Sequence, residues 1–272
     1  MAVPLAQSAI YPSLKDKTVV VTGGAEGIAA ATVELFCRQG SKVIFFDISG
    51  TSADSLIKQI KQHQAEVNAL PWTIPSFYYC DVTNLEQLRE TAENVLKEHG
   101  TVDVLVNSAA AAGAKSRVPS VKVTPESWEF DINVNLRHVF FLTQRIVPAM
   151  QKQGRGSIIN MGSISWRIPA VGTPVYMAAK AAIMGLTKTH SKEFGNEGVR
   201  VNSVMPGAIA TERQIKEVLT KEYREEVMRN QTVKRDLVPQ EVASVILFLA
   251  SDDSSGVTGS SYVVDGGWVS DV

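Results

Sequence analysis

The sequence predicts an α/β fold, formed by a single doubly wound domain with a parallel sheet of about seven strands and helices on both faces. Short runs of β-branched and other apolar residues alternate with longer amphipathic segments along the whole chain. The short runs are apolar along their entire length, which is typical of strands covered by helices on both sides. No linker-like segment interrupts this alternation, so we expect one catalytic domain over residues 14–272.

The individual elements follow from these two patterns in chain order. Runs rich in Val, Ile and Phe, such as KTVVVT and KVIFFD, mark strands. Apolar residues at helical spacing, such as Ile28, Val33 and Phe36 after the first strand, mark helices. The expected strands are 17–22, 42–47, 76–81, 102–107, 156–161, 200–204 and 261–264. The expected helices are one that opens after Gly23 and those at 53–63, 85–99, 126–151, 174–194 and 240–249.

Three segments lie outside this alternation. Residues 1–13 have no periodicity and are predicted to form a surface arm. The polar stretch 223–235 is predicted to be a mobile flap, and the charge-rich stretch 216–229 a solvated helix beside the cleft.

Composition and charge exclude several classes of protein. With 27 basic and 28 acidic residues the net charge is −1, which argues against a nucleic-acid or anionic-membrane binder. No apolar stretch reaches about 18 residues and no basic, then apolar leader begins the chain, so we expect a cytoplasmic protein. Cys37 and Cys80 are expected to be buried free thiols, and the four histidines have no spacing typical of a metal site.

A glycine turn follows the first strand and predicts a dinucleotide site. Gly23 and Gly27 in TGGAEGI allow the backbone to approach a diphosphate, whose charge the helix N-terminus favours. Asp47 ends the second strand, as the acidic residue of a Rossmann fold does, and can accept hydrogen bonds from the adenosine ribose. A 2′-phosphate would meet its negative charge, and Glu26, not a cation, precedes Gly27. The expected cofactor is therefore NAD, with NADP less favoured.

A tyrosine and a lysine spaced four apart point to acid/base chemistry. Tyr176 and Lys180 share one face of the helix expected at 174–194, and Ser163 stands thirteen residues earlier at the end of a strand. An ammonium near a phenol stabilises the phenolate and lowers the tyrosine pKa toward the range of an acid/base catalyst. In isolation, a half-buried tyrosine beside a solvated lysine is the simpler explanation of such a pair.

Together with the glycine turn, this cluster resembles the short-chain dehydrogenase/reductase family along almost the whole chain, from about Leu14 to Trp268. The resemblance implies that Tyr176 is the general acid/base, that Ser163 holds the reacting oxygen, and that Lys180 tunes the tyrosine and binds the nicotinamide ribose. It implies that Asn135, in NVNLRH, anchors a water in the proton relay, although an Asn near a helix kink often only caps backbone groups. The further cofactor residues that it implies are Ile28, Asp81, Val82, Asn107, Pro206, Gly207, Ile209 and Thr211. DGG at 265–267 completes the match, and the family also suggests a homotetramer.

Two departures from the family pattern concern the loops around the cofactor. Ala29 replaces the third glycine of the turn, and Asn107-Ser108-Ala109-Ala110 stands where the family has Asn-Asn-Ala-Gly. Because Ala110 restricts positive φ, we expect the loop of residues 109–114 to take a different path over the nicotinamide.

The resemblance is closest to bacterial aldose 1-dehydrogenases, which oxidise D-xylose, L-arabinose or D-galactose at C1. YPSL at 11–14, NVNLRHVFF, GSIINMGSISW and ATERQ carry it. It implies that Tyr176 deprotonates the anomeric hydroxyl while hydride passes to NAD, giving an aldonolactone. Ser165 and Trp166 are expected to line the substrate cavity, although a Trp there is as often a core or interface residue.

Two other functions remain open on the sequence. The apolar loops 109–114 and 168–175 offer few partners for sugar hydroxyls, and favour a reductase or dehydrogenase for a less polar ketone or secondary alcohol. A dinucleotide-binding protein without catalysis is the third hypothesis, which the retention of Ser163, Tyr176 and Lys180 disfavours.

Overall fold

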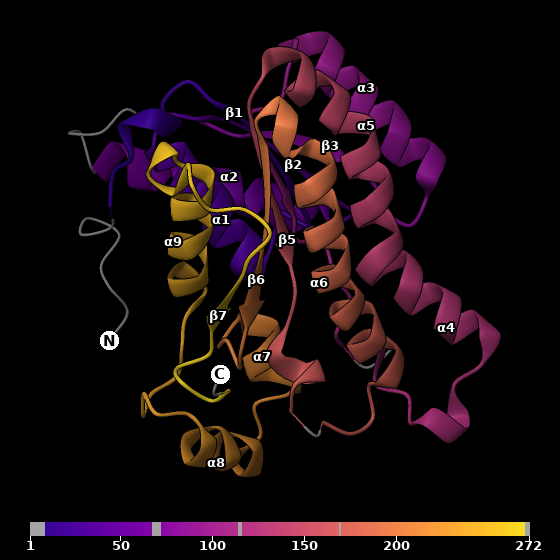
Figure 1. Cartoon of the computed structure of the whole chain (residues 1–272). Helices are drawn as coiled ribbons and strands as arrows, with labels where there is room; N and C mark the ends of the chain where they lie inside the picture. The colour runs from indigo at the N-terminus through magenta and orange to yellow at the C-terminus, as the bar shows by residue number, and fades with distance from the viewer. Residues whose placement is uncertain (1–8, 67–71, 114–115, 169, 270–272) are drawn as a thin grey trace.

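The computed structural model describes residues 9–66, 72–113, 116–168 and 170–269. Seven parallel strands form one sheet in the order β3-β2-β1-β4-β5-β6-β7, which confirms the predicted fold class (Figure 1). The order reverses between β1 and β4, and ligands of doubly wound sheets bind beyond the carboxyl ends of the strands at such a point. The strands are β1 (Thr18–Thr22), β2 (Lys42–Asp47), β3 (Ser76–Tyr79), β4 (Val104–Asn107), β5 (Gly156–Met161), β6 (Val199–Pro206) and β7 (Ser261–Val264).

Helices cover both faces of the sheet because alternate strand residues point to opposite sides. Val19 and Val21 of β1 belong to one buried cluster and Val20 to the other. The first cluster lies under α1 (Gly27–Arg38), α2 (Gly50–Glu66) and α9 (Pro239–Ala250). On the other face lie α3 (Leu85–His99), α5 (His138–Gln153) and α6 (Pro174–Phe194), as Figure 1 shows. Both faces of the sheet are therefore buried, as the strands that are apolar along their whole length predict.

Two predicted helices are each divided in the structure. The helix expected at 126–151 is divided into α4 (Pro125–Ile132), a π-helical turn (Asn133–Arg137) and α5. The charged segment is two helices, α7 (Glu212–Glu217) and α8 (Lys221–Asn230), because the Thr220 hydroxyl accepts a hydrogen bond from the Tyr223 amide and starts a new helix. Most of the predicted flap is therefore helical.

The described part of the N-terminal arm is attached to the domain. The Tyr11 amide donates to Gln39 Oε1 at 2.7 Å, and Gln39 Nε2 donates to the Ala9 carbonyl at 3.0 Å. Ser13 Oγ accepts from the Asp252 amide at 3.1 Å. Residues 9–13 therefore lie against the fold, whereas the start of the predicted arm, residues 1–8, lies outside the described residues.

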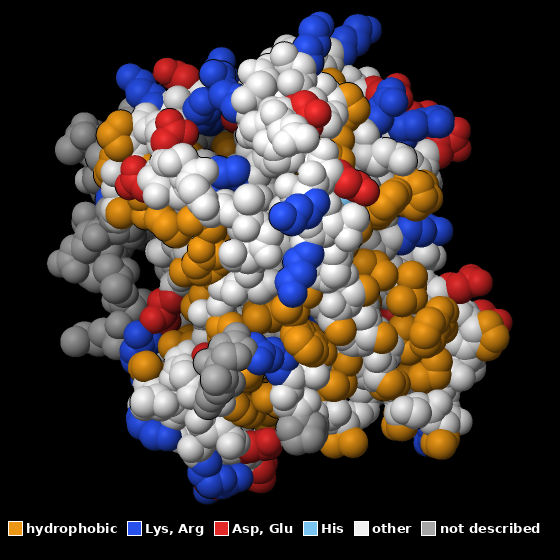
Figure 2. Space-filling model, viewed as in Figure 1, with side chains coloured by type: hydrophobic (Ala, Val, Ile, Leu, Met, Phe, Trp, Pro, Cys, Tyr) orange, Lys and Arg blue, Asp and Glu red, His pale blue; other side chains and the backbone are white. Residues whose placement is uncertain are grey.

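Large apolar side chains also reach the surface. Trp128 of α4 is 48% exposed, and Phe140 and Phe141 of α5 are each 41% exposed. Figure 2 shows hydrophobic side chains gathered over this side of the molecule. Within the described ranges, none of the helices is both apolar enough and long enough to cross a bilayer.

Candidate active site

The glycine turn between β1 and α1 needs residues without a side chain. Gly23 has φ +67° and Gly27 φ +59°, values that L-residues with a Cβ rarely adopt. A Cβ on Gly23 would lie 2.8 Å from the Ala109 Cα, and one on Gly27 would lie 3.2 Å from Thr211 Cγ2. The turn therefore brings the bare N-terminus of α1 against two other loops, which leaves its free N–H groups available to an anion.

Asp47 lies at the end of β2, beside this turn. Its Oδ2 accepts from the Ala25 amide and its Oδ1 from the Ser49 amide, each at 3.0 Å. Each carboxylate oxygen can accept a further bond, so the group keeps capacity for two ribose hydroxyls. Nearby, Ser52 Oγ donates to Glu26 Oε1 at 2.7 Å, which orients a second carboxylate at the same edge. This end of the cleft is therefore negative.

Ser163, Tyr176 and Lys180 meet where β5 and α6 lie side by side. The Ser163 hydroxyl lies close enough to the Tyr176 phenol to lower its pKa, and it accepts a hydrogen bond from the Ser165 amide at 3.1 Å. Lys180 is 2% exposed, donates from Nζ to the Met161 carbonyl at 2.8 Å, and places Nζ 5.7 Å from the centre of the Tyr176 ring. The structure thus brings all three predicted side chains together.

The pKa of Tyr176 shifts in the direction opposite to the one expected. Burial raises the pKa of the Tyr176 phenol, against the lowering effects of the Ser163 hydroxyl and of the Arg213 and Arg117 charges. Burial also lowers the pKa of Lys180 to about 8. The expected net lowering of the tyrosine pKa by Lys180 was therefore wrong for this arrangement, because the loss of water around the phenol outweighs the nearby positive charges.

Asn135 lies in the π-helical turn and is fully buried. Its Oδ1 accepts from the Ala111 amide and its Nδ2 donates to the Ala111 carbonyl, both at 3.2 Å. The loop is held at its start as well, since Thr22 Oγ1 accepts from the Ser108 and Ala109 amides at 3.0 Å. These bonds show how an alanine loop is fixed where the family has glycine. Residue 114, at the end of this predicted loop, lies outside the described residues.

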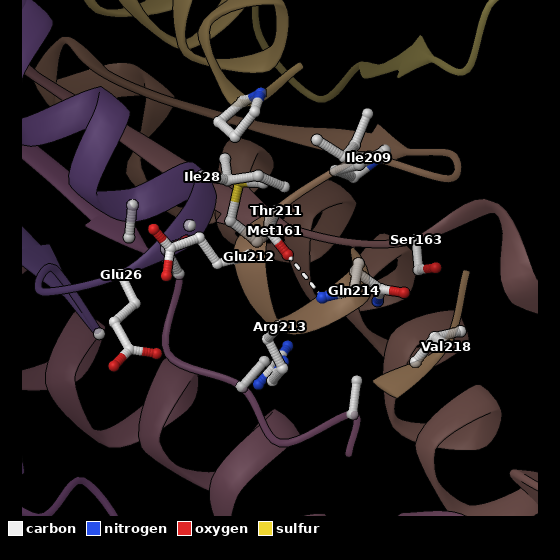
Figure 3. Close-up of a pocket in the computed structure, with 18 of the residues that line it drawn as sticks. Glu26, Ile28, Met161, Ser163, Ile209, Thr211, Glu212, Arg213, Gln214 and Val218 are labelled. Atoms are coloured by element: carbon white, nitrogen blue, oxygen red, sulfur yellow. Dashed lines mark hydrogen bonds between the residues drawn. The ribbon is translucent and has the colours of Figure 1, made fainter. Parts of the chain in front are cut away.

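The segment that ends β6 and leads into α7, residues 206–214, also lines the cleft (Figure 3). A Cβ on Gly207 would lie 2.6 Å from the Asp265 Cβ, so the glycine allows β6 to pass closely beside the DGG turn. Asp265 holds that turn by accepting from the Gly267 and Val269 amides at 2.8 and 2.7 Å. Thr211 caps α7 through the Gln214 amide at 3.2 Å.

A cleft of about 1690 Å³ runs along the carboxyl ends of the strands and joins these parts. Asn107, Asn135 and Trp166 do not line it. The Asn107 amide is buried and donates to Asn160 Oδ1 at 2.9 Å, and Trp166 lies under the Arg167 guanidinium, 5.5 Å from the indole centroid. The predicted residues that do line the cleft are Gly23, Glu26, Gly27, Ile28, Asp47, Asp81, Val82, Ser163, Ser165, Tyr176, Lys180, Pro206, Gly207, Ile209 and Thr211.

Several polar residues of the cleft were not predicted from the sequence. They are Arg117, Arg213, Glu217 and Tyr223, which line the cleft together with the apolar loop residues that were expected to dominate around the substrate. Arg213 follows Thr211 within the ATERQ match and offered a weak signal, whereas Arg117 stands alone after the alanine loop. Among the described residues, no three His, Cys, Asp or Glu side chains are grouped so that they could hold a metal.

The residues of the cleft fit a nicotinamide dinucleotide: a bare helix N-terminus for the diphosphate, a carboxylate at the end of β2 for the ribose, and Lys180 beside Tyr176. Comparison with known proteins extends this result to the whole chain. A family model described as enoyl-(acyl carrier protein) reductase matches residues 23–269.

Three relatives illustrate the similarity. A D-xylose 1-dehydrogenase of Caulobacter vibrioides is 44% identical over 96% of this chain and 99% of its own length. A protein of Rhizobium meliloti named as a probable galactose dehydrogenase is 40% identical over 98% of this chain and 99% of its own. A crystal structure described as a candidate gluconate dehydrogenase of Agrobacterium tumefaciens superposes with a TM-score of 0.86 at 25% identity, covering 97% of this chain and 100% of that one. The chain therefore belongs to the short-chain dehydrogenase/reductase family and is an oxidoreductase that acts on CH–OH groups.

Proposed function

We propose that this protein is an NAD-dependent aldose 1-dehydrogenase, which oxidises C1 of a pentose or hexose to the aldonolactone. The single observation that supports it most is that Ser163 and Tyr176 lie together beside the buried Lys180, in a cleft that also holds Asp47. The similarity to a D-xylose 1-dehydrogenase and to a protein named for galactose over nearly the full chain supports the sugar class.

The residues of the cluster divide the work of the reaction. Tyr176 takes the proton of the C1 hydroxyl while the C1–H electron pair leaves as hydride, so that C1 becomes the carbonyl carbon of the lactone. NAD, when bound, supplies the hydride acceptor. Ser163 donates to the reacting oxygen and holds it against Tyr176, and the Lys180 charge stabilises the phenolate. Because burial raises the pKa of Tyr176, we expect the oxidation rate to rise with pH on the alkaline side.

Asp47 supports NAD as the cofactor. The lining residues of the glycine turn and of 46–59 include the acidic Glu26 and Asp47 but neither Lys nor Arg among those that the structure describes. A 2′-phosphate there would lie beside these negative charges without a cation to balance it. Asn135 keeps its proposed place in the proton relay, and its side chain also holds Ala111.

NADH formation on a panel of D-galactose, D-xylose and L-arabinose, with NAD and NADP in parallel, tests this function. Tyr176→Phe should abolish turnover while NADH binding, followed by fluorescence, stays within about twofold. Tyr79→Phe changes an exposed tyrosine on β3 in the same way and should leave both unchanged. Turnover of no sugar on the panel, or turnover that survives in Tyr176→Phe, would contradict the proposal.

A second candidate function is the reduction of a less polar ketone. Ala110, Ala112, Ile168 and Val171 line the cleft near the catalytic cluster. A 3-oxoacyl-[acyl-carrier-protein] reductase of Thermotoga maritima is 41% identical over 94% of this chain and 99% of its own length. NADH consumption with a 3-oxoacyl thioester, in the absence of turnover of any sugar, would favour this second function.

We also propose a homo-oligomer, as the family resemblance suggests, with the exposed pair Phe140 and Phe141, whose ring centroids lie 5.3 Å apart, as one contact. Side chains of this size are seldom exposed together on a monomer. Light scattering coupled to gel filtration should show more than one subunit, and Phe141→Glu should reduce the mass.

A further inference from the structure

Two arginines stand at the substrate end of the cleft. Arg117 follows the alanine loop after β4, and Arg213 is the second residue of α7. Both line the cleft that contains Ser163 and Tyr176. Both also line a side pocket of about 560 Å³, which lies within the usual size of small-molecule sites, about 300–1,000 Å³. The two side chains therefore border one space, although they belong to segments far apart in the sequence.

Neither Arg117 nor Arg213 forms an ion pair or hydrogen bond within the described part of the chain. The neighbouring cations differ in this respect. Lys216 of α7 pairs with Glu212 at 3.6 Å, and Arg224 of α8 pairs with Asp236 at 3.1 Å. Arg117 and Arg213 remain available to a ligand.

The balance of charge in the side pocket indicates the kind of ligand. Its titratable residues are Arg117, Arg213 and Glu217, so one positive charge is left over. One surplus charge matches a carboxylate better than a phosphate dianion. The planar fork of an arginine is also well suited to a carboxylate. The remaining lining, which includes Ala110, Ala111 and Phe130, offers sugar hydroxyls few side-chain partners, so an ionic contact would supply much of the affinity.

We propose that the substrate is an aldose that bears a carboxylate, a hexuronate, and that Arg117 and Arg213 bind its carboxylate while its C1 hydroxyl lies at Ser163 and Tyr176. This inference rests on the aldose 1-dehydrogenase function proposed above and narrows its substrate class. The position of both arginines agrees with it, since their charges act on the Tyr176 phenol and lower its pKa. A ligand that touches both groups would thus lie within reach of the catalytic oxygen.

The first test compares D-galacturonate with D-galactose, which differ in the carboxylate at C6. The unmodified protein should show a kcat/KM at least tenfold higher for the uronate. Arg117→Gln and Arg213→Gln should each lower the uronate-to-galactose ratio of kcat/KM by tenfold or more, through KM rather than kcat. Added NaCl should raise KM for the uronate and not for galactose.

The matched control removes the same charge elsewhere. Lys97→Gln, on the exposed side of α3, should leave the ratio unchanged, and its thermal melting should equal that of the two arginine variants. Glucose 6-phosphate in the same assay separates the two anionic groups. Turnover of the phosphate in place of the uronate would overturn the assignment of a carboxylate.

A binding measurement keeps the inference separate from the proposed function. Calorimetric titration of galacturonate into the protein saturated with NADH should show binding that weakens tenfold in either arginine variant. Turnover of neutral aldoses without any uronate binding would overturn this inference and leave the function intact. Uronate binding without turnover of any aldose would contradict the function, and would leave only the assignment of a carboxylate to Arg117 and Arg213. An equal loss of NADH affinity in the arginine variants would assign these residues to the cofactor and overturn the proposal.

Discussion

Lys180→Met should make the protein more stable at neutral pH, although it removes a residue of the catalytic cluster. Lys180 is 2% exposed, and burial lowers its pKa from 10.5 to about 8. At 1.36 kcal/mol per pKa unit, holding the buried ammonium costs about 3 kcal/mol at pH 7. Loss of the hydrogen bond to the Met161 carbonyl offsets about 1 kcal/mol of this gain. A net stabilisation of about 2 kcal/mol should remain.

The effect of Lys180→Met on the free energy of unfolding should change sign with pH. Between pH 8 and 10.5 the unfolded chain keeps the proton on Lys180 that the folded protein has lost, so the free energy of unfolding of the unmodified protein rises with pH. The cost of the buried charge is complete below pH 8 and is gone at pH 10.5. At the higher pH only the missing hydrogen bond remains, and the variant should be about 1 kcal/mol less stable than the unmodified protein.

Urea unfolding of the cofactor-free protein at pH 7 and pH 10.5 measures both quantities. Lys97→Met removes an exposed lysine of α3 and corrects for the general effect of losing one titrating group. A Lys180→Met variant that is less stable than the unmodified protein by the same amount at both pH values would contradict this prediction. The buried ammonium would then have no measurable free-energy cost.

Four further predictions concern other residues of the site. Burial, together with the Lys180 charge, lowers the pKa of His138 to about 3, so between pH 6.5 and 4.5 the protein should lose about 2 kcal/mol that His138→Gln retains; parallel urea curves for the two proteins would contradict this. Asp47→Ala should lower the ratio of NAD to NADP use by tenfold or more in kcat/KM, and a preference for NADP that the substitution leaves unchanged would exclude NAD as the cofactor. Asn135→Ala breaks two buried hydrogen bonds to Ala111 and should cost about 1–3 kcal/mol in urea unfolding, whereas no loss would show that the loop holds itself. Trp166→Phe should leave the sugar KM unchanged because Trp166 does not line the cleft, and a several-fold rise in KM would place it in the substrate site.

The cofactor half of the site could be predicted from local sequence because its chemistry depends on the backbone. Gly23 and Gly27 hold a turn that only glycine enters without strain, and Asp47 follows a strand whose end is visible as KVIFFD. Tyr176 and Lys180 are four residues apart on one helix, so their proximity is a property of that helix. These features can be predicted without knowing which distant segments are in contact.

Other features depend on contacts between distant segments. The π-helical turn around Asn135 interrupts an amphipathic pattern that is typical of one long helix, and its role appears only in the bonds to Ala111. Thr220 divides a charged stretch that periodicity alone joins. The net effect on the Tyr176 pKa also required the structure, since the sequence shows the nearby lysine but not the burial of the phenol.

The wound parallel sheet, the glycine turn and the proximity of Tyr176 to Lys180 could be predicted from the sequence, because strand periodicity, glycine conformation and helix spacing are local properties. The residues that line the cleft around Tyr176 could not be predicted from the sequence. In the folded chain Trp166 does not line the cleft. Arg117 and Arg213, almost a hundred positions apart in the sequence, line one pocket. The physical reason is that charge and burial at a point in space depend on every segment packed around it, and no periodicity in the chain records which segments those are.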